Sequence, residues 1–219
     1  MNVPAPIRVV FAVHGFPPEC VGGTESCVLA TAKTLRALGH EVVVVAGSPS
    51  PTAPASTERG EMEGVPVYRL HRDALDVDHW SKSDDPEIEA SWRRLLRELR
   101  PDVVHVHHWI RLTRRLVLAA AAEGVPAVVT LHDSGATCPR AFRVRDDASC
   151  ERPVGPTSCV DCAPRLAGVS DADAVDELAA FAEDFRRELG AARTLIAPSA
   201  AHAAFLAPHL GAAAAKLRT

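Results

Sequence analysis

Short runs of β-branched residues, each separated from the next by a helical pattern, constrain the fold of this chain most strongly. The first two runs are IRVVFAV at residues 7–13 and EVVVVA at residues 41–46. Neither alternates between apolar and polar residues, so both are typical of strands that are covered on both faces. Residues 26–38 between them have helical periodicity, and Gly39 is placed to end that helix. A strand, a helix and a second buried strand predict parallel pairing.

The same alternation continues to the end of the chain. A helix is predicted to begin at Pro86, because proline is favoured as the first helical residue and Asp85 before it is a favoured N-cap residue. Ser199 is a suitable cap for a last helix. Residues 47–64 are rich in Pro, Ser, Thr and Ala and are predicted to form a loop, and no element is assigned to the tail GAAAAKLRT. The further strands are predicted at residues 65–69, 102–107, 127–131 and 194–197, and the further helices at residues 86–99, 113–123 and 173–189.

Six strands with helices between them predict an α/β fold with a doubly wound, mainly parallel, Rossmann-like sheet. We see neither an internal repeat nor a second domain. Residues 133–168 have no periodicity, and we interpret them as a Cys-rich loop insertion in a single domain that spans residues 1–219.

Composition and charge narrow the possible partners. The 219 residues are 47% hydrophobic and 24% charged, and the net charge is −4. This balance is that of an ordinary soluble protein and gives no general signature of nucleic-acid binding. No apolar run approaches the ~20 residues that a membrane-spanning helix needs. The apolar start lacks a small-residue cleavage site, so we interpret it as a strand and expect a cytoplasmic protein.

The segment HGFPPECVGGTES, which begins at His14, joins the first strand to the first helix. Ligands of doubly wound sheets bind beyond the carboxyl ends of the strands, where this segment lies. Gly22 and Gly23 lack a Cβ atom, so the backbone there can approach a ligand closely and adopt positive φ. The free N–H groups of the following helix favour phosphate, with Thr24 or Ser26 as candidate caps. The segment matches neither GxGxxG nor a P-loop, and a plain tight turn is the alternative interpretation.

Several motifs, in order, resemble the N-terminal domain of retaining glycosyltransferases of family four, which have the GT-B fold. They are FPPECVGGTESCVLATAKTLRALGHEVVVVAG, RPDVVHVHHW, GVPAVVTLHD with the CPR that follows, and ARTLIAPSAAHAAFLA. The resemblance covers nearly all of the chain.

The resemblance implies a role for several residues. In this family the N-terminal domain mostly binds the acceptor, and a second Rossmann-like domain binds the nucleotide sugar. Gly22 and Gly23 are then contacts of the donor diphosphate. His132 is the catalytic residue near the donor sugar, and Asp133 binds the acceptor or orients His132. Backbone N–H groups aimed at the leaving diphosphate would stabilise its developing charge, and no catalytic metal is expected.

The Glu-x7-Glu motif and the nucleotide pocket of the family belong to the second domain, which these residues do not include. We therefore expect the acceptor-binding half of a hexosyltransferase that is inactive alone. A stand-alone carbohydrate- or partner-binding module and half of a nucleotide-sugar epimerase are the alternatives. The acceptor class (glycan, lipid-linked or small molecule), the donor sugar and the oligomeric state stay open.

The remaining histidines lie near strand ends. His105 and His107 share one face of a strand because strand side chains repeat every two residues. His14 is expected to face the cleft, and His107, His108 and Trp109 are candidates for an acceptor surface, whereas His105 is interpreted as packing. The basic helix at residues 91–100 suggests peripheral contact with the inner face of a membrane, but a solvated surface is preferred.

Four cysteines lie in the aperiodic segment, and the last two form a CxxC pair. Four thiolates can bind Zn²⁺ tetrahedrally and so fold a segment that lacks a core of its own. Structural zinc is preferred over one or two disulfides and over a redox CxxC. Cys20 and Cys27 are interpreted as separate, with Cys27 buried on the first helix. The predicted zinc ligands are Cys138, Cys150, Cys159 and Cys162.

Overall fold

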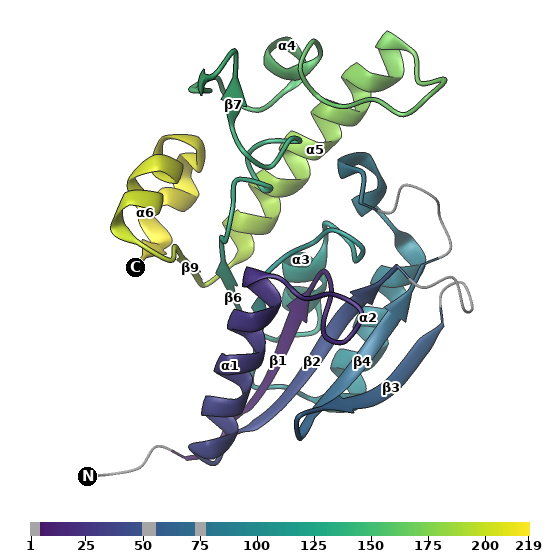
Figure 1. Cartoon of the computed structure of the whole chain (residues 1–219), viewed down its shortest axis with the longest axis vertical. Helices are drawn as coiled ribbons and strands as arrows, with labels where there is room; N and C mark the ends of the chain where they lie inside the picture. Colours follow the sequence, from purple (N-terminus) through teal and green to yellow (C-terminus); the bar gives the residue numbers. More distant parts are fainter. Residues whose placement is uncertain (1–4, 50–55, 73–77) are drawn as a thin grey trace.

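The computed structural model describes residues 5–49, 56–72 and 78–219. Eight strands form one sheet in the order β10-β9-β6-β5-β1-β2-β4-β3 (Figure 1). All neighbouring strands pair in parallel except β3 and β4. The six predicted strands are all present, as β1 (Arg8–Val13), β2 (Glu41–Ser48), β4 (Val65–His71), β5 (Val103–Val106), β6 (Ala127–Thr130) and β9 (Thr194–Ile196).

The order of these six strands creates a switch point in the middle of the sheet. From β1 the chain adds β2 and β4 on one side, and it then returns to place β5, β6 and β9 on the other side. The helices that follow β1 and β5 therefore cover opposite faces of the sheet, and ligands of this architecture bind at the carboxyl edge where these two strands meet. This is the predicted doubly wound architecture.

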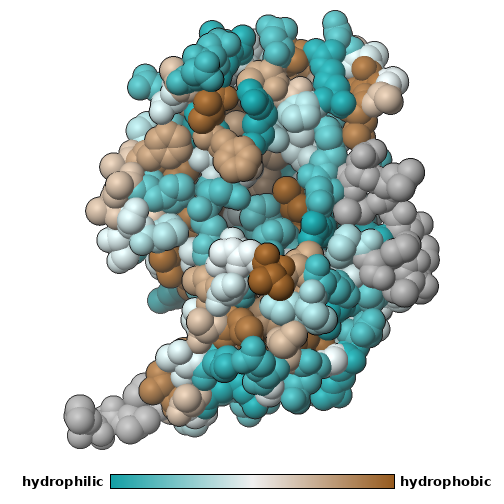
Figure 2. Space-filling model, viewed as in Figure 1, coloured by the Kyte–Doolittle hydropathy of each residue, from teal (hydrophilic) through white to brown (hydrophobic). Residues whose placement is uncertain are grey.

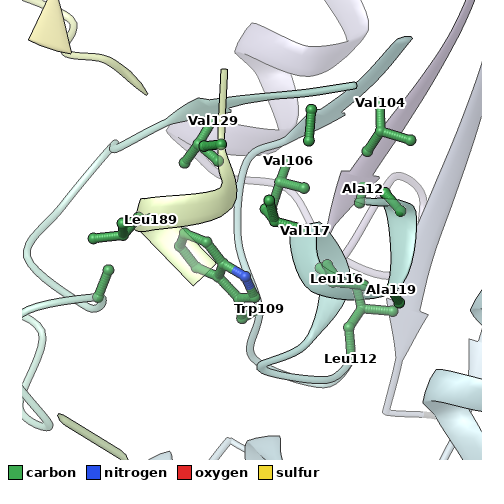
Figure 3. Packing of buried hydrophobic residues seen from close by; sticks show 14 of the residues in the cluster. Ala12, Val104, Val106, Trp109, Leu112, Leu116, Val117, Ala119, Val129 and Leu189 are labelled. Atoms are coloured by element: carbon green, nitrogen blue, oxygen red, sulfur yellow. The ribbon is translucent and has the colours of Figure 1, made fainter. Parts of the chain in front are cut away.

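Alternate residues of β1 explain why the strand is apolar throughout. Val9 and Phe11 pack under α1 (Gly23–Ala37), together with residues of β2 and β4. Val10 and Ala12 face the opposite side of the sheet, where a larger core forms. Figure 3 shows part of that core, including Ala12 and the residues around Trp109. Most of its helical residues come from α2 (Pro86–Leu99), α3 (Leu116–Ala122) and α5 (Asp171–Ala191).

Local capping follows the sequence at two of the three predicted positions. Asp85 Oδ1 accepts hydrogen bonds from the N–H groups of Glu87 and Ile88, both at 3.0 Å, at the start of α2. Ser199 Oγ accepts from His202 N at 3.1 Å at the start of α6 (Ala200–Leu206). Helix α1 differs, because Gly22 is its N-cap and no side chain caps it. The prediction that Thr24 or Ser26 caps this helix is therefore wrong.

Two strands of the eight-stranded sheet were not predicted. Part of the predicted loop at residues 47–64 is β3 (Thr57–Met62), which pairs with β4 through a turn at Glu63 and Gly64, both with positive φ. The sequence of β3, TERGEM, is that of an exposed edge strand, without the apolar alternation that identifies a half-buried one. At the opposite edge, β10 (Leu217–Arg218) pairs with β9. The rest of the predicted loop includes residues 50–55, which lie outside the described residues.

The Cys-rich segment at residues 133–168 lies above the carboxyl edge of the sheet, beside α5 (Figure 1). It contains only the hairpin β7 (Val144–Arg145) and β8 (Ala148–Ser149) and the short helix α4 (Pro156–Cys159). The described residues also form three 3₁₀ turns, η1 (Trp80–Ser83), η2 (Ala207–His209) and η3 (Gly211–Lys216).

Candidate functional site

The N-terminus of α1 opens at the switch point without a side-chain cap. Gly22 has φ −154°, and Gly23 is not among the glycines with positive φ, so neither needs the left-handed region. The expectation of positive φ is therefore wrong. What these glycines provide is a backbone without Cβ atoms, which another group can approach closely. A Cβ at Gly23 would have nothing within 4 Å, whereas one at Gly22 would lie 2.7 Å from Glu25 Oε2. Open space thus faces Gly23 at a helix end that favours anions.

Glu25 and His14 form a buried pair behind this helix end. Glu25 is 5% exposed, and its Oε1 lies 3.0 Å from His14 Nε2. Burial, helped by His108 and Arg111, lowers the pKa of His14 to about 3, so the ring is neutral at pH 7 and donates to the carboxylate. The sequence predicted Glu25 in the first turn of a helix but did not predict its pairing with His14. The local sign of a partner is the position of Glu25 on the buried face of α1.

Two arginines hold the loop after β1 in place. Arg69 on β4 donates to Pro17 O at 2.6 Å and lies 3.3 Å from Glu19. Arg111 donates to Cys20 Sγ at 2.8 Å and holds Asp78 through two hydrogen bonds. The loop that precedes Gly22 is therefore fixed from both sides of the switch point.

Two other glycines make room for these contacts. A Cβ at Gly15 would lie 2.7 Å from the Cys20 side chain, and one at Gly47 would lie 2.7 Å from Arg111 Cβ. The close approach of Arg111 to the end of β2 and to the loop therefore requires glycine at both positions.

Imidazole rings connect the ends of β5 and β6. His105 Nε2 lies 2.7 Å from Thr130 Oγ1, and His107 Nδ1 lies 2.8 Å from His132 Nε2. The rings of His105 and His107 are 4.1 Å apart between centroids, as expected for two residues on one strand face. The predicted residues His107 and His132 are thus brought into contact.

Asp133 pairs with His108 rather than with His132. Asp133 Oδ2 lies 3.3 Å from His108 Nε2, and Oδ1 accepts from Gly135 N at 2.7 Å. Burial alone would raise the pKa of Asp133, but these two hydrogen bonds and the charge of His108 hold it below its usual value. The ring of His108 also lies 4.4 Å from that of His14, between centroids. His14, His108, His132 and Asp133 therefore meet beside the N-terminus of α1.

Trp109 lies in the core and not on an open surface. It is 4% exposed, and its indole N–H donates to Glu188 Oε1 at 3.1 Å. Figure 3 places the ring beside Leu189 of α5. Placement on an acceptor surface is therefore not supported, because the apolar ring packs against α5 as the chain crosses the carboxyl edge.

The four predicted zinc ligands are half-buried free cysteines, and Cys27 on α1 is exposed rather than buried as predicted. Burial raises the pKa of the Cys159 thiol, and Cys138, Cys150 and Cys162 lie near enough to raise it further. Over the described ranges, no group of three or more His, Cys, Asp or Glu side chains has the geometry of a metal site.

The basic face of α2 is engaged within the fold. Arg93 and Arg97 both donate to the carboxylate of Glu123, which follows α3, at 2.8–2.9 Å. The hydrophobic residues on the face of the molecule in Figure 2 are scattered rather than gathered into one patch. Within the described part of the chain, no helix combines the length and the apolar character that crossing a membrane requires.

Acidification below pH 6.5 is expected to destabilise the fold because His105 and His107 are buried as neutral rings. Burial, followed by the charge of neighbouring imidazoles, lowers the pKa of His105 to about 4 and that of His107 to about 2. Between these values and the unfolded value of about 6.5, the unfolded chain binds more protons than the folded chain. Their contribution to stability is complete above pH 6.5 and decreases as the pH falls, by about 1.4 kcal/mol per pH unit for each ring.

Urea unfolding at pH 7 and pH 5 measures this loss. The variant His107→Asn has one titrating ring fewer and should lose less stability between the two values. An equal loss in the variant and the wild type would show that His107 is not the source.

A family model described as Glycosyltransferase Family 4 matches residues 21–219. A glycogen synthase from Mycobacterium tuberculosis is 30% identical over 139 residues, which cover 58% of this chain and 33% of that protein. This chain therefore spans only part of the curated relatives that it matches.

Solved structures share the fold at low sequence identity. The catalytic domain of starch synthase IV from Arabidopsis thaliana, bound to ADP and acarbose, matches with a TM-score of 0.56 and 17% identity over 97% of this chain and 51% of that one. UDP-GlcNAc 2-epimerase from Methanocaldococcus jannaschii matches with a TM-score of 0.50 and 11% identity over 97% of this chain and 45% of that one. At these identities the likeness concerns the fold alone.

Proposed function

This chain belongs to glycosyltransferase family 4, and we propose that it forms the acceptor-side half of an enzyme that transfers a sugar from a nucleotide sugar to an acceptor with retention. The observation that carries the proposal is the uncapped N-terminus of α1, which opens at Gly23 at the switch point of the sheet. Contacts from Glu25 to His14, from His14 to His108 and from His108 to Asp133 connect this helix end to the residues that follow β6.

The proposed site of the donor diphosphate is this helix end. Its free N–H groups and the helix dipole attract an anion, and the absence of a Cβ at Gly23 lets phosphate oxygens approach the backbone. As the bond between sugar and diphosphate breaks, negative charge develops on the leaving oxygen. Donors that are already oriented stabilise this charge without reorganisation.

His132 and Asp133 are the proposed sugar contacts. His132 is half-buried, and burial lowers its pKa, so at neutral pH it is an uncharged hydrogen-bonding group. The charged carboxylate of Asp133 is oriented by His108 and Gly135 N, which suits it to accept a hydrogen bond from a hydroxyl group. His14 is the proposed wall of the same site, since its ring packs against that of His108.

The donor and acceptor classes are proposed from the relatives. The starch synthase structure holds ADP and acarbose, and the curated relative is a glycogen synthase. We propose a nucleoside-diphosphate sugar as the donor and a glycan as the first acceptor to test, with lipid-linked and small-molecule acceptors next. Because the chain spans about half of the starch synthase domain, the nucleotide pocket is proposed to lie in a second Rossmann-like domain.

We expect this chain alone to transfer no sugar. Incubation with ADP-glucose or UDP-glucose and a maltooligosaccharide, followed by detection of the elongated product, checks this. Product formation above a no-protein control would contradict the need for a second domain. Conversion of UDP-GlcNAc without an acceptor would instead support the epimerase alternative.

Amide NMR of the same chain tests the donor site directly. Millimolar UDP is expected to shift the signals of Gly22 and Gly23, whereas a non-phosphorylated nucleoside at the same concentration should not. Equal shifts with both compounds, or shifts confined to other residues, would count against a diphosphate site.

Metal analysis of the purified chain tests structural zinc. If four thiolates bind zinc after local rearrangement, one zinc ion per chain is expected. Chelation should then remove the zinc together with the order in residues 133–168. A chain without zinc and with four titratable thiols in this segment would reject the site. Intact mass under non-reducing conditions distinguishes disulfides from both results.

A further inference from the structure

His107 and His132 are joined by a single hydrogen bond across the carboxyl ends of β5 and β6. Nδ1 of His107 lies 2.8 Å from Nε2 of His132, and the two ring planes differ by 25°. A hydrogen bond between two neutral imidazoles requires one ring to donate and the other to accept. The proton positions of the two rings are therefore linked.

Both rings are neutral at physiological pH. Burial, with the charges of His105 and His132, lowers the pKa of His107 to about 2, and burial also lowers the pKa of His132. Each ring then carries one N–H, which leaves two arrangements. Either both protons are on Nδ1 and His107 donates, or both are on Nε2 and His132 donates.

Burial of the far side of His107 distinguishes these arrangements. Its Nε2 is buried and has no hydrogen-bond partner among the described residues. The rings of Phe11 and His105 pack against His107 at 5.3 Å and 4.1 Å between centroids. A proton on this Nε2 would be an orphaned buried donor, which is rare in folded proteins. A proton on Nδ1 is used in the bond to His132, so this arrangement is favoured.

We propose that His107 is a positioning residue that holds His132 as its Nδ1–H tautomer. The Nε2 of His132 is occupied as an acceptor, so Nδ1–H is the donor that His132 offers to a ligand. Among the described residues that Nδ1 has no hydrogen-bond partner, and the side chain is only half-buried. This part rests on the proposed function: the group that accepts the hydrogen bond from His132 Nδ1–H is a hydroxyl group of the donor sugar.

Long-range ¹H–¹⁵N NMR of the imidazoles at pH 7 tests this assignment on the 219-residue chain. The expected result is a neutral His132 with a protonated Nδ1 and an unprotonated Nε2. A His132 whose proton is on Nε2, or one that is charged, would overturn the proposal. This experiment needs neither a ligand nor catalytic activity.

Three variants separate positioning from packing. His107→Asn keeps a short N–H donor near the position of Nδ1 and should retain the Nδ1–H form of His132. His107→Leu removes the donor and should abolish that preference. The control is His105→Gln, because His105 bonds Thr130 and not His132, and it should leave the tautomer of His132 unchanged. An unchanged tautomer in His107→Leu would refute the role of His107. If that variant does not fold, the wild-type spectrum still tests the tautomer of His132, and loss of the Nδ1–H form in His107→Asn would still contradict the role of His107.

UDP-glucose and UDP, used as probes, distinguish this proposal from the proposed function. Because only the sugar would contact His132, His107→Leu should weaken UDP-glucose binding about tenfold and leave UDP binding unchanged. Equal weakening of both probes would contradict a specific role in positioning His132. Absence of binding of either probe to the wild type would count against the donor site, whereas the tautomer result would stand.

Discussion

Replacement of Glu188 by alanine is expected to lower the free energy of unfolding by about 3 kcal/mol or more. The carboxyl group is fully buried on α5, and three N–H groups donate to its oxygens. Two come from the backbone of Val117 and Leu118 in the first turn of α3, and the third is the indole N–H of Trp109. Alanine would leave all three donors buried and unpaired.

Urea unfolding of Glu188→Ala measures the loss, and Glu183→Ala is the matched control. Glu183 is on the same helix, but it is exposed and pairs with the exposed Arg186, so its removal should change stability by less than about 1 kcal/mol. Equal effects of the two variants would show that Glu188 does not connect α5 to α3.

Glu188 also gives this prediction a pH dependence. Burial raises its pKa to about 8, even though the three N–H donors oppose the shift. Because the folded pKa lies above the unfolded value, the contribution of this group is complete below about pH 4.5 and decreases as the pH rises toward 8. From pH 5 to pH 8 the wild type should therefore lose stability relative to Glu188→Gln, whose side chain does not titrate.

Introduction of a carboxylate at Gly23 is expected to reduce donor binding by about 10- to 100-fold without destabilising the fold. An aspartate in the first turn of α1 favours the helix by about 0.3–1 kcal/mol because of the helix dipole. Its Cβ enters open space. The same negative charge would repel the diphosphate and occupy the space that it needs, so stability and donor affinity should change in opposite directions.

Titration of the complete protein with the donor nucleotide, together with thermal unfolding of the same samples, measures both quantities. Gly23→Ala is the uncharged variant and should lose less affinity than Gly23→Asp. Gly190→Ala on α5 is the distant control, because its Cβ also enters open space. Donor affinity that is the same in Gly23→Asp and Gly190→Ala would place the diphosphate elsewhere.

Part of the candidate site was predictable from local sequence, and part was not. His132 and Asp133 follow a strand closely, and Gly23 begins the helix after the first strand, so the sequence predicts the edge of the sheet on which all three lie. The pairing of Asp133 with His108 was not predicted, because 25 residues separate them. The position of Glu188 on the apolar face of a helix, beside Phe185 and Leu189, indicates that it is buried. The local pattern does not show which groups bind its carboxyl group, because those partners lie on other elements.

Sequence by itself determined the six central strands, the helices between them, the caps at Asp85 and Ser199 and the edge of the sheet that carries the candidate site. These features depend on periodicity and on hydrogen bonds between near neighbours, which a local stretch encodes. Tertiary structure alone decided that Trp109 is buried against α5, that His107 contacts His132 and that Arg111 holds Cys20. These contacts join residues 25 to 91 positions apart. They exist only after the strand order brings the ends of β1, β5 and β6 together.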